Sequence, residues 1–135
     1  MKLTFANLKQ GDAGGNTPVE YLIAVEAELL IYQDEVPIFR EEYFPVAELA
    51  SSLWGWLQDG IEYDFSFNSM SYEEEAIIAL RQDRTGWLIS SSFAPGLLIS
   101  SISPTELKVM CERFIREVHQ GLIVLGINPY PVLYK

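Results

Sequence analysis

Two segments of this chain space their apolar residues as amphipathic helices do, and the other patterned runs alternate every second residue. In residues 45–60, PVAELASSLWGWLQDG, apolar side chains recur every three or four positions along one stripe. Residues 103–125 show the same spacing after SPTE, a capping box in which Ser103 caps and Glu106 reaches back. The order of strands, helix, strands and helix predicts an α+β domain built on an antiparallel sheet.

The alternating runs predict a single antiparallel sheet of about five to seven strands joined by hairpins, with both amphipathic helices packed on one face. Every odd position from Val19 to Ile31 is apolar, which predicts one long strand. The Gly- and Asn-rich residues 10–18 predict a flexible loop, and residues 127–135 an extended tail. A length of 135 residues fits one domain spanning residues 1–135.

Two short patterns place aromatic side chains. Trp54 and Trp56 are about 200° apart around the first helix, so they flank its apolar stripe and we expect both to be half-buried. The run IEYDFSF alternates from residue 61 to 67. This alternation predicts a strand that buries its apolar set, Ile61, Tyr63, Phe65 and Phe67.

The net charge of −10 is unevenly distributed along the chain. Residues 12–75 hold fifteen acids and one base, Arg40, which gives 1 − 15 = −14. The remaining residues hold eight bases and four acids, which gives 8 − 4 = +4. Nucleic acid is excluded as a partner of the acidic block, because like charges repel. The block favours a partner protein with a basic surface, or serves solubility alone.

No group of residues predicts catalysis, a cofactor or a metal. Glu62 and Asp64 are expected on one face of a strand, about 7 Å apart, with side chains that point away from each other. A bound cation needs several oxygens directed at one point. The glutamates of residues 73–75 fall in a polar turn, where they point in different directions and stay hydrated. His119 is the only histidine, and Cys111 lies on an apolar stripe as a small core residue. The sequence therefore predicts a protein that is not an enzyme.

The sequence also predicts a cytoplasmic protein without membrane contact. The single Cys111 forms no intrachain disulfide, and the N-terminus has no apolar run typical of a signal peptide. The longest apolar run, YLIAVEAELLIY, contains Glu26 and Glu28 and is too short to span a bilayer.

The acidic block supplies the candidates for partner contact. Aromatic residues tend to dominate the energy of a contact, while charges at its rim set the association rate. We expect an aromatic anchor from Trp54 or Trp56. The acidic candidates are Glu62, Asp64, Glu73, Glu74 and Glu75, with Glu41, Glu42 and Asp59 behind them.

In its overall character the chain resembles the immunity proteins of bacterial toxin systems. The residues that carry this resemblance are EYFPVAELASSLWGWL, DFSFNSMSYEEEAIIAL and GWLIS, within about residues 19–125 of a small, strongly acidic chain. The resemblance implies a cytoplasmic inhibitor that binds a cognate toxin, often a basic nuclease, and that needs no catalytic residues. An acidic face would steer association with a basic cleft.

Two alternatives to an immunity-type function stay open. The sequence also leaves the oligomeric state undecided. One is a small acidic secretion chaperone, although the chain lacks the opening helix expected of that family. The other is an enzyme with a pocket between sheet and helices. Such a pocket would need polar residues converging inside the sheet, where the predicted inward positions are Ile, Val, Phe and Leu.

Overall fold

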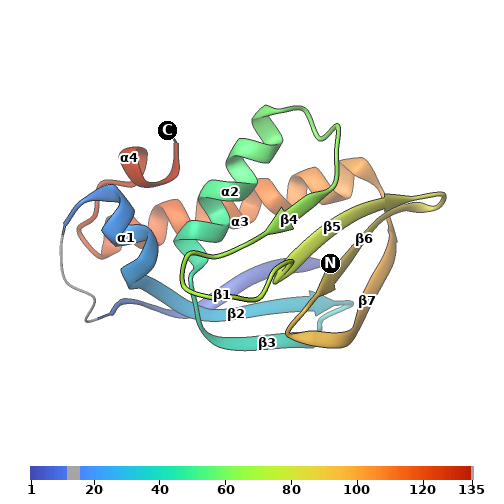
Figure 1. The fold of residues 1–135 in the computed structure, drawn as a ribbon, viewed down its shortest axis with the longest axis horizontal. Helices are drawn as coiled ribbons and strands as arrows, with labels where there is room; N and C mark the ends of the chain where they lie inside the picture. The colour runs from blue at the N-terminus through green and yellow to red at the C-terminus, as the bar shows by residue number, and fades with distance from the viewer. Residues whose placement is uncertain (12–15, 135) are drawn as a thin grey trace.

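The computed structural model describes residues 1–11 and 16–134, which form two antiparallel sheets and four helices (Figure 1). The class is α+β, as predicted. The elements in chain order are β1 (Lys2–Gln10), α1 (Pro18–Ala24), β2 (Val25–Gln33), β3 (Val36–Phe44), α2 (Val46–Gln58), β4 (Phe65–Phe67), β5 (Ile78–Asp83), β6 (Gly86–Ser91), β7 (Ala94–Ile102), α3 (Pro104–Val124) and α4 (Pro129–Leu133).

The prediction of a single sheet is wrong. One sheet has three strands in the order β1-β2-β3, and the other has four in the order β4-β5-β6-β7. The chain leaves β3 into α2 before the second sheet begins, and α2 intervenes between the two sets of hairpins. β3 and β7 lie close together without a shared ladder of hydrogen bonds. The predicted hairpins are present, β2 with β3 and β5 with β6.

The core lies between the two sheets and the helices α2 and α3 (Figure 1). α3 runs along the molecule against α2 and β1, and α2 contacts β2 and β4. Phe5 of β1 meets Phe114 of α3 edge to face, with ring centroids 6.1 Å apart. Trp56 of α2 meets Trp87 of β6 in the same way at 5.4 Å. Both sheets are therefore anchored on the same pair of helices, each buried aromatic contributing roughly 1.5–3 kcal/mol.

Residues 18–24 form helix α1, so the predicted strand from Val19 is wrong in its first half. Thr17 is the N-cap residue of α1: its Oγ1 accepts from the Glu20 amide at 3.2 Å and donates to Glu20 Oε1 at 2.8 Å. Pro18 fits the first turn of the helix. The second half of the prediction is confirmed, because the odd positions from Val25 to Ile31 are buried. The predicted loop at residues 10–18 is partly strand and cap, and residues 12–15 lie outside the described residues.

The predicted strand of residues 61–67 is shorter than expected, and only Phe65–Phe67 pair with β5. Phe65 and Phe67 are buried as predicted. Tyr63 is 53% exposed, which contradicts its expected burial, and Ile61 is half-buried. Ile61 has a positive φ of 59°, and the Tyr63 carbonyl accepts from Trp56 Nε1 at 2.8 Å rather than from a neighbouring strand. The chain therefore turns at the end of α2 before it becomes a strand.

Residues 127–135 were expected to form an extended tail, and this prediction is also wrong. Asn128 Oδ1 accepts from the Tyr130 amide at 3.2 Å, and Pro129 begins the short helix α4. Val132 and Leu133 are fully buried and belong to the core. The sequence signal for this helix is an N-cap residue followed by proline, in NPYPVL. The two prolines had instead favoured the prediction of an extended segment.

The second long helix is predicted correctly, including its cap. The Ser103 hydroxyl accepts from the Glu106 amide at 3.1 Å, and Pro104 is in the first turn. α3 continues past Gly121, where the absence of a side chain lets Leu8 of β1 approach the helix closely.

Candidate protein-binding surface

The predicted turn that carries three glutamates is an ordered loop between β4 and β5, residues 68–77, here called the acidic loop. Its anchor is Glu48 in the first turn of α2, one of the few buried polar residues. Glu48 Oε1 accepts from the Ser69 hydroxyl at 2.6 Å, and Oε2 accepts from the Met70 amide at 2.9 Å. The first turn of a helix also favours a carboxylate. This carboxylate therefore fixes the start of the acidic loop to α2.

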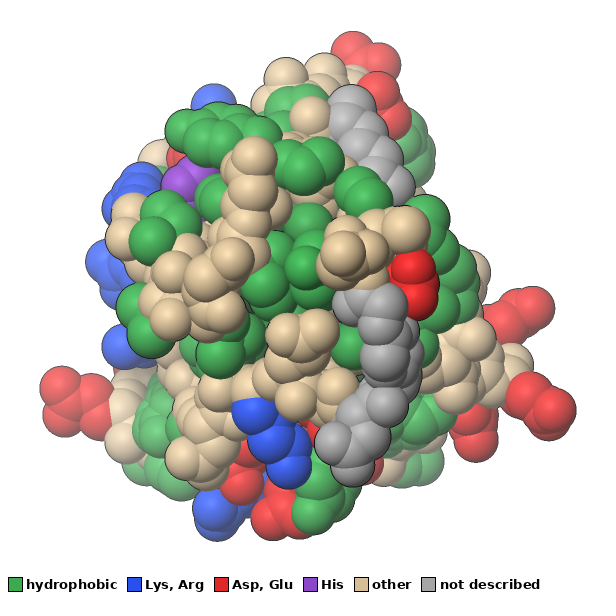
Figure 2. Space-filling model, turned by 90° about the vertical axis from the view of Figure 1, so that its left-hand side faces the viewer, with side chains coloured by type: hydrophobic (Ala, Val, Ile, Leu, Met, Phe, Trp, Pro, Cys, Tyr) green, Lys and Arg blue, Asp and Glu red, His purple; other side chains and the backbone are tan. Residues whose placement is uncertain are grey.

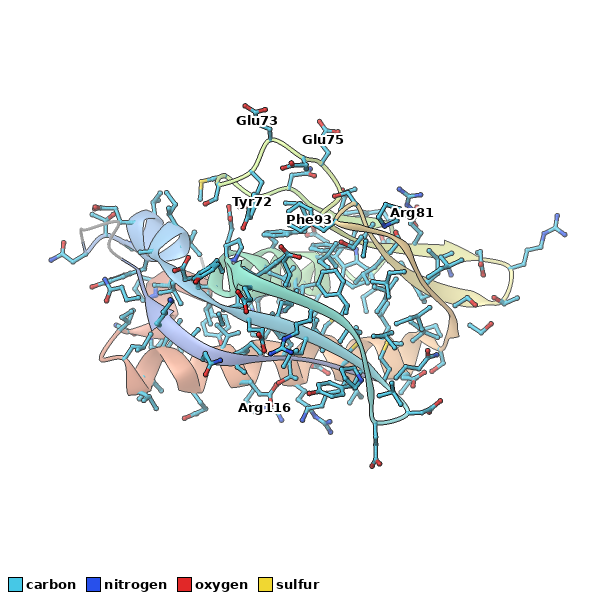
Figure 3. The ribbon with its side chains drawn as sticks, turned by 90° about the horizontal axis from the view of Figure 1, so that it is seen from below. Tyr72, Glu73, Glu75, Arg81, Phe93 and Arg116 are labelled. Carbon is cyan, nitrogen blue, oxygen red and sulfur yellow. The ribbon has the colours of Figure 1, made fainter. Side chains whose placement is uncertain are left out.

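The far end of the acidic loop is fixed by hydrogen bonds to the first residue of the loop and to the turn that follows β6. The Ala76 amide donates to Asn68 Oδ1 at 2.8 Å, and the Ala76 carbonyl accepts from the Ser92 amide at 3.1 Å. Between these anchors Glu73, Glu74 and Glu75 are all exposed. Figure 3 shows Glu73 and Glu75 directed away from the body of the molecule. The loop thus presents three carboxylates on a framework fixed at both ends.

Tyr72 joins the acidic loop to β3. Its ring meets Phe93 edge to face at 5.3 Å, and its hydroxyl donates to the Tyr43 carbonyl at 3.2 Å. Burial raises the pKa of Tyr72, and the charges of Glu41, Glu26 and Glu74 raise it further. These three carboxylates come from β3, β2 and the loop, so the structure brings together acids that are distant in sequence.

Two exposed apolar side chains lie beside these acids, and the sequence analysis did not identify them. Tyr43 is 60% exposed and Met70 is 58% exposed. Tyr43 has a positive φ of 55° at an irregularity in the pairing of β2 with β3, and Lys9 Nζ lies 4.8 Å from the centre of its ring. A strained backbone at an exposed aromatic is a feature of binding sites. No pattern in the sequence indicates this turn of the strand.

The other acidic candidates form a separate group, which we call the α2-end acids: Asp59, Glu62 and Asp64. All three are exposed. Asp59 accepts from the Tyr63 hydroxyl, and Asp64 accepts from the Gln82 amide at 3.1 Å. Glu48 ties the acidic loop to the first turn of α2, whereas these acids follow its last turn, and a 13-residue helix is about 20 Å long. The structure therefore does not gather all the predicted acids into one patch.

β3 contributes the last two acidic candidates. Glu42 is exposed and Glu41 is partly exposed beside the acidic loop. The neighbouring Arg40 forms an ion pair with Glu28 of β2, with Nε and Oε2 2.9 Å apart. The hydrogen bond and the charge of Glu28 raise the pKa of the Arg40 guanidinium, and the charge of Glu42 adds a smaller contribution. The one base of the acidic block is thus paired mainly with Glu28, and its charge also acts on Glu42.

The two tryptophans differ from the prediction and from each other. Trp54 is half-buried as expected, with its ring edge to face with Tyr134 at 5.4 Å. Trp56 is only 3% exposed and its indole N–H is bonded to the Tyr63 carbonyl, so it is a core residue and not a contact anchor. Trp56 is buried because the second sheet covers that side of α2 through Phe65 and Trp87.

The residues with chemical reactivity are separated from one another. Cys111 is buried in α3, and burial raises the pKa of its thiol to about 12. A thiol with this pKa is a poor nucleophile. His119 Nδ1 is hydrogen-bonded to the hydroxyl of Tyr134 at 2.8 Å. Within residues 1–11 and 16–134, no three His, Cys, Asp or Glu side chains are placed to hold a metal ion.

None of the helices among the described residues has the length and apolar character needed to cross a membrane. No curated protein and no solved structure matches this chain. A family described as a domain of unknown function, DUF7878, matches residues 1–123, from β1 to the last turn of α3. The chain therefore belongs to the DUF7878 family.

Proposed function

We propose that this protein is a non-catalytic protein-binding domain of the immunity type, which neutralises a toxin with a basic surface by binding it directly. The observation that carries the proposal is the acidic loop. A buried carboxylate, Glu48, and Tyr72 hold three exposed glutamates in place beside two exposed apolar side chains. Such anchoring holds the glutamates in one arrangement before a partner arrives, which lowers the entropic cost of binding.

The surface around the acidic loop has the composition of a contact site. Tyr43 and Met70 supply an aromatic and a flexible apolar anchor, both of which are enriched at interface centres. Charged groups surround them, because Glu41 and Glu74 both act on Tyr72 and Glu42 lines a hollow together with Tyr43. In favourable cases, charges at the rim raise the association rate of a partner of opposite charge by about 10- to 10³-fold. The partner that fits has a basic cleft with room for an aromatic side chain.

The test begins with the partner that copurifies with the protein, followed by association kinetics between the two purified components. The variant replaces Glu73, Glu74 and Glu75 with Lys. It should associate at least about tenfold more slowly than the wild type at low salt, because the steering charges are reversed. The wild-type rate should itself fall steeply as salt screens charges beyond about 10 Å near 0.1 M.

The matched control reverses the α2-end acids Asp59, Glu62 and Asp64 to Lys, which changes the net charge by the same amount outside the acidic loop. If the proposed surface is correct, this control associates much faster than the loop variant. Equal, salt-independent rates for all three proteins would overturn the electrostatic basis of the proposal. A complex in which the partner keeps its full toxic activity would overturn the inhibitory role.

A further inference from the structure

A groove on the opposite side of the molecule has the character of a second binding site. It lies between α2 and α3, has a volume of about 520 Å³, and is also lined by Tyr134, which follows α4. In Figure 3, Arg116 of this groove lies on the side away from Glu73 and Glu75. The groove is within the size range of small-molecule sites, about 300–1,000 Å³.

Three of the rings that line the groove contact one another, and we call this set its aromatic floor. Trp54 and Tyr134 meet edge to face at 5.4 Å, and Tyr134 lies tilted against His119 with ring centroids 5.6 Å apart. The hydrogen bond between His119 Nδ1 and the Tyr134 hydroxyl fixes the relative positions of these two rings. Burial raises the pKa of Tyr134, with a smaller contribution from the charge of Tyr130. These contacts give a preformed aromatic surface, which costs little entropy when a flat ligand binds.

The rim of the groove is positively charged in an otherwise acidic protein. Lys108 and Arg116 contribute two positive charges and Glu112 one negative charge, which leaves 2 − 1 = +1. Among the described residues, neither Lys108 nor Arg116 forms an ion pair. Figure 2 shows Lys and Arg side chains along one edge of this end of the molecule, with the single imidazole, in purple, beside them. We call this site the basic groove.

The two bases are not equivalent. They are eight residues apart on α3, about 12 Å, so one small anionic group cannot contact both. Arg116 precedes His119 by one turn and is therefore the base nearer to the aromatic floor. A guanidinium forms paired hydrogen bonds to a carboxylate or a phosphate, which suits it to orient such a group. The chemistry of the groove thus combines ring faces and ring edges with one adjacent anion-binding group.

We propose that the basic groove binds a small molecule made of a planar aromatic ring with an attached anionic group, the ring lying on Trp54 and Tyr134 and the anion on Arg116. This site is independent of the acidic loop and goes beyond the proposed function. Neither half of the ligand suffices, because an exposed Arg alone holds an anion weakly in water, and a shallow aromatic surface alone holds a neutral ring weakly.

The experiment follows the indole N–H signals of the three tryptophans by NMR, with the Trp54 signal assigned from Trp54→Phe. The anionic probes are 2-naphthoate for the carboxylate class and adenosine monophosphate for the phosphate class. Adenosine and inorganic phosphate are the matched probes that carry only the ring or only the anion. A shift of the Trp54 signal with either anionic probe supports the proposal and names the class. Adenosine and phosphate should bind at least about tenfold more weakly.

Arg116→Gln should lower the affinity for the bound probe at least about tenfold. The matched control is Arg113→Gln, an exposed base on the same helix that does not line this groove. Both side chains are exposed, so the variants should keep the thermal midpoint of the wild type. The proposal fails if no probe moves the Trp54 signal, if adenosine binds as well as adenosine monophosphate, or if the two Arg variants lose affinity equally.

Discussion

The acidic side and the α2–α3 side of this protein hold their surface groups in two different ways. On the acidic side, a loop without regular structure is fixed by a buried carboxylate, Glu48, and by hydrogen bonds to its backbone. On the other side, two helices and α4 meet through rings, with one side-chain hydrogen bond between His119 and Tyr134. The hydrogen bonds to Glu48 form in only one conformation of the acidic loop, whereas packed rings can shift slightly and remain in contact.

This difference indicates what each side is suited to bind. The acidic loop places charges in water around a few exposed apolar side chains, which suits a large partner that approaches by diffusion. The basic groove combines a prearranged set of rings with a few exposed charges at its rim, which suits a small ligand. The comparison also predicts that mutations change stability differently on the two sides. The α2–α3 side depends on the burial of apolar side chains, whereas the acidic side depends on the hydrogen-bonded carboxylate of Glu48.

The largest expected effect is on the side held by packing. Leu133 of α4 is fully buried, so Leu133→Ala should lower the free energy of unfolding by about 2–5 kcal/mol. Val124 at the end of α3 is 85% exposed, so Val124→Ala should change the free energy of unfolding by less than about 0.5 kcal/mol. Urea denaturation of both variants measures the difference. Equal, small losses would show that α4 is not part of the core.

A smaller effect is expected from the buried carboxylate. Glu48→Gln keeps one acceptor oxygen and loses the other, so either the Ser69 hydroxyl or the Met70 amide is left without its partner. The free energy of unfolding should fall by about 1–3 kcal/mol. Hydrogen exchange should become faster at the Met70 and Ser71 amides, while exchange in α3 is unchanged.

The control for this variant is Glu42→Gln, an exposed carboxylate of β3 on the same side of the molecule. It removes the same charge without exposing a buried donor, and stability should stay within about 0.5 kcal/mol of the wild type. Losses of similar size in the two variants would mean that Glu48 acts only through charge, and the anchoring of the acidic loop would need another cause.

The sequence predicted most of the regular structure because the decisive signals were local. The period of α2 and α3, the capping box at Ser103 and the turn at Gly86 each depend on neighbouring residues. The failure at residues 18–24 had a local cause as well. Thr17 is an N-cap residue followed by proline, and this signal outweighs an alternation that Leu22 and Ala24 had already made imperfect.

The candidate site was predicted less well because its parts meet only in three dimensions. Glu73, Glu74 and Glu75 were correctly placed in an exposed turn, but nothing local links residue 48 to residue 69. The acidic block was treated as one surface, and α2 separates it into two groups. Exposed Tyr43 depends on a bulge in strand pairing, which a sequence pattern does not record. The burial of Trp56 likewise depends on a second sheet that the sequence did not predict.

The smallest expected effect separates the two sides by their electrostatics. Tyr72 and Tyr134 both have a pKa above the ordinary value of 10, and burial is the main cause in each. Three carboxylates add to the shift at Tyr72, whereas only Tyr130 adds to it at Tyr134. In both cases the fold favours the neutral phenol. This contribution to stability is complete below pH 10 and is lost as the pH rises through the pKa of the folded state.

Salt should therefore lower the pKa of Tyr72 more than that of Tyr134, because screening weakens the carboxylate charges and leaves burial unchanged. Ultraviolet titration of the wild type, Tyr72→Phe and Tyr134→Phe at low salt and at about 1 M salt assigns each phenol by difference. Glu74→Gln provides the matched test without salt, since it should lower the pKa of Tyr72 and leave that of Tyr134 in place. If salt and Glu74→Gln move both phenols equally, the acids around Tyr72 do not converge as the structure shows. The acidic loop and β3 would then form two surfaces instead of one.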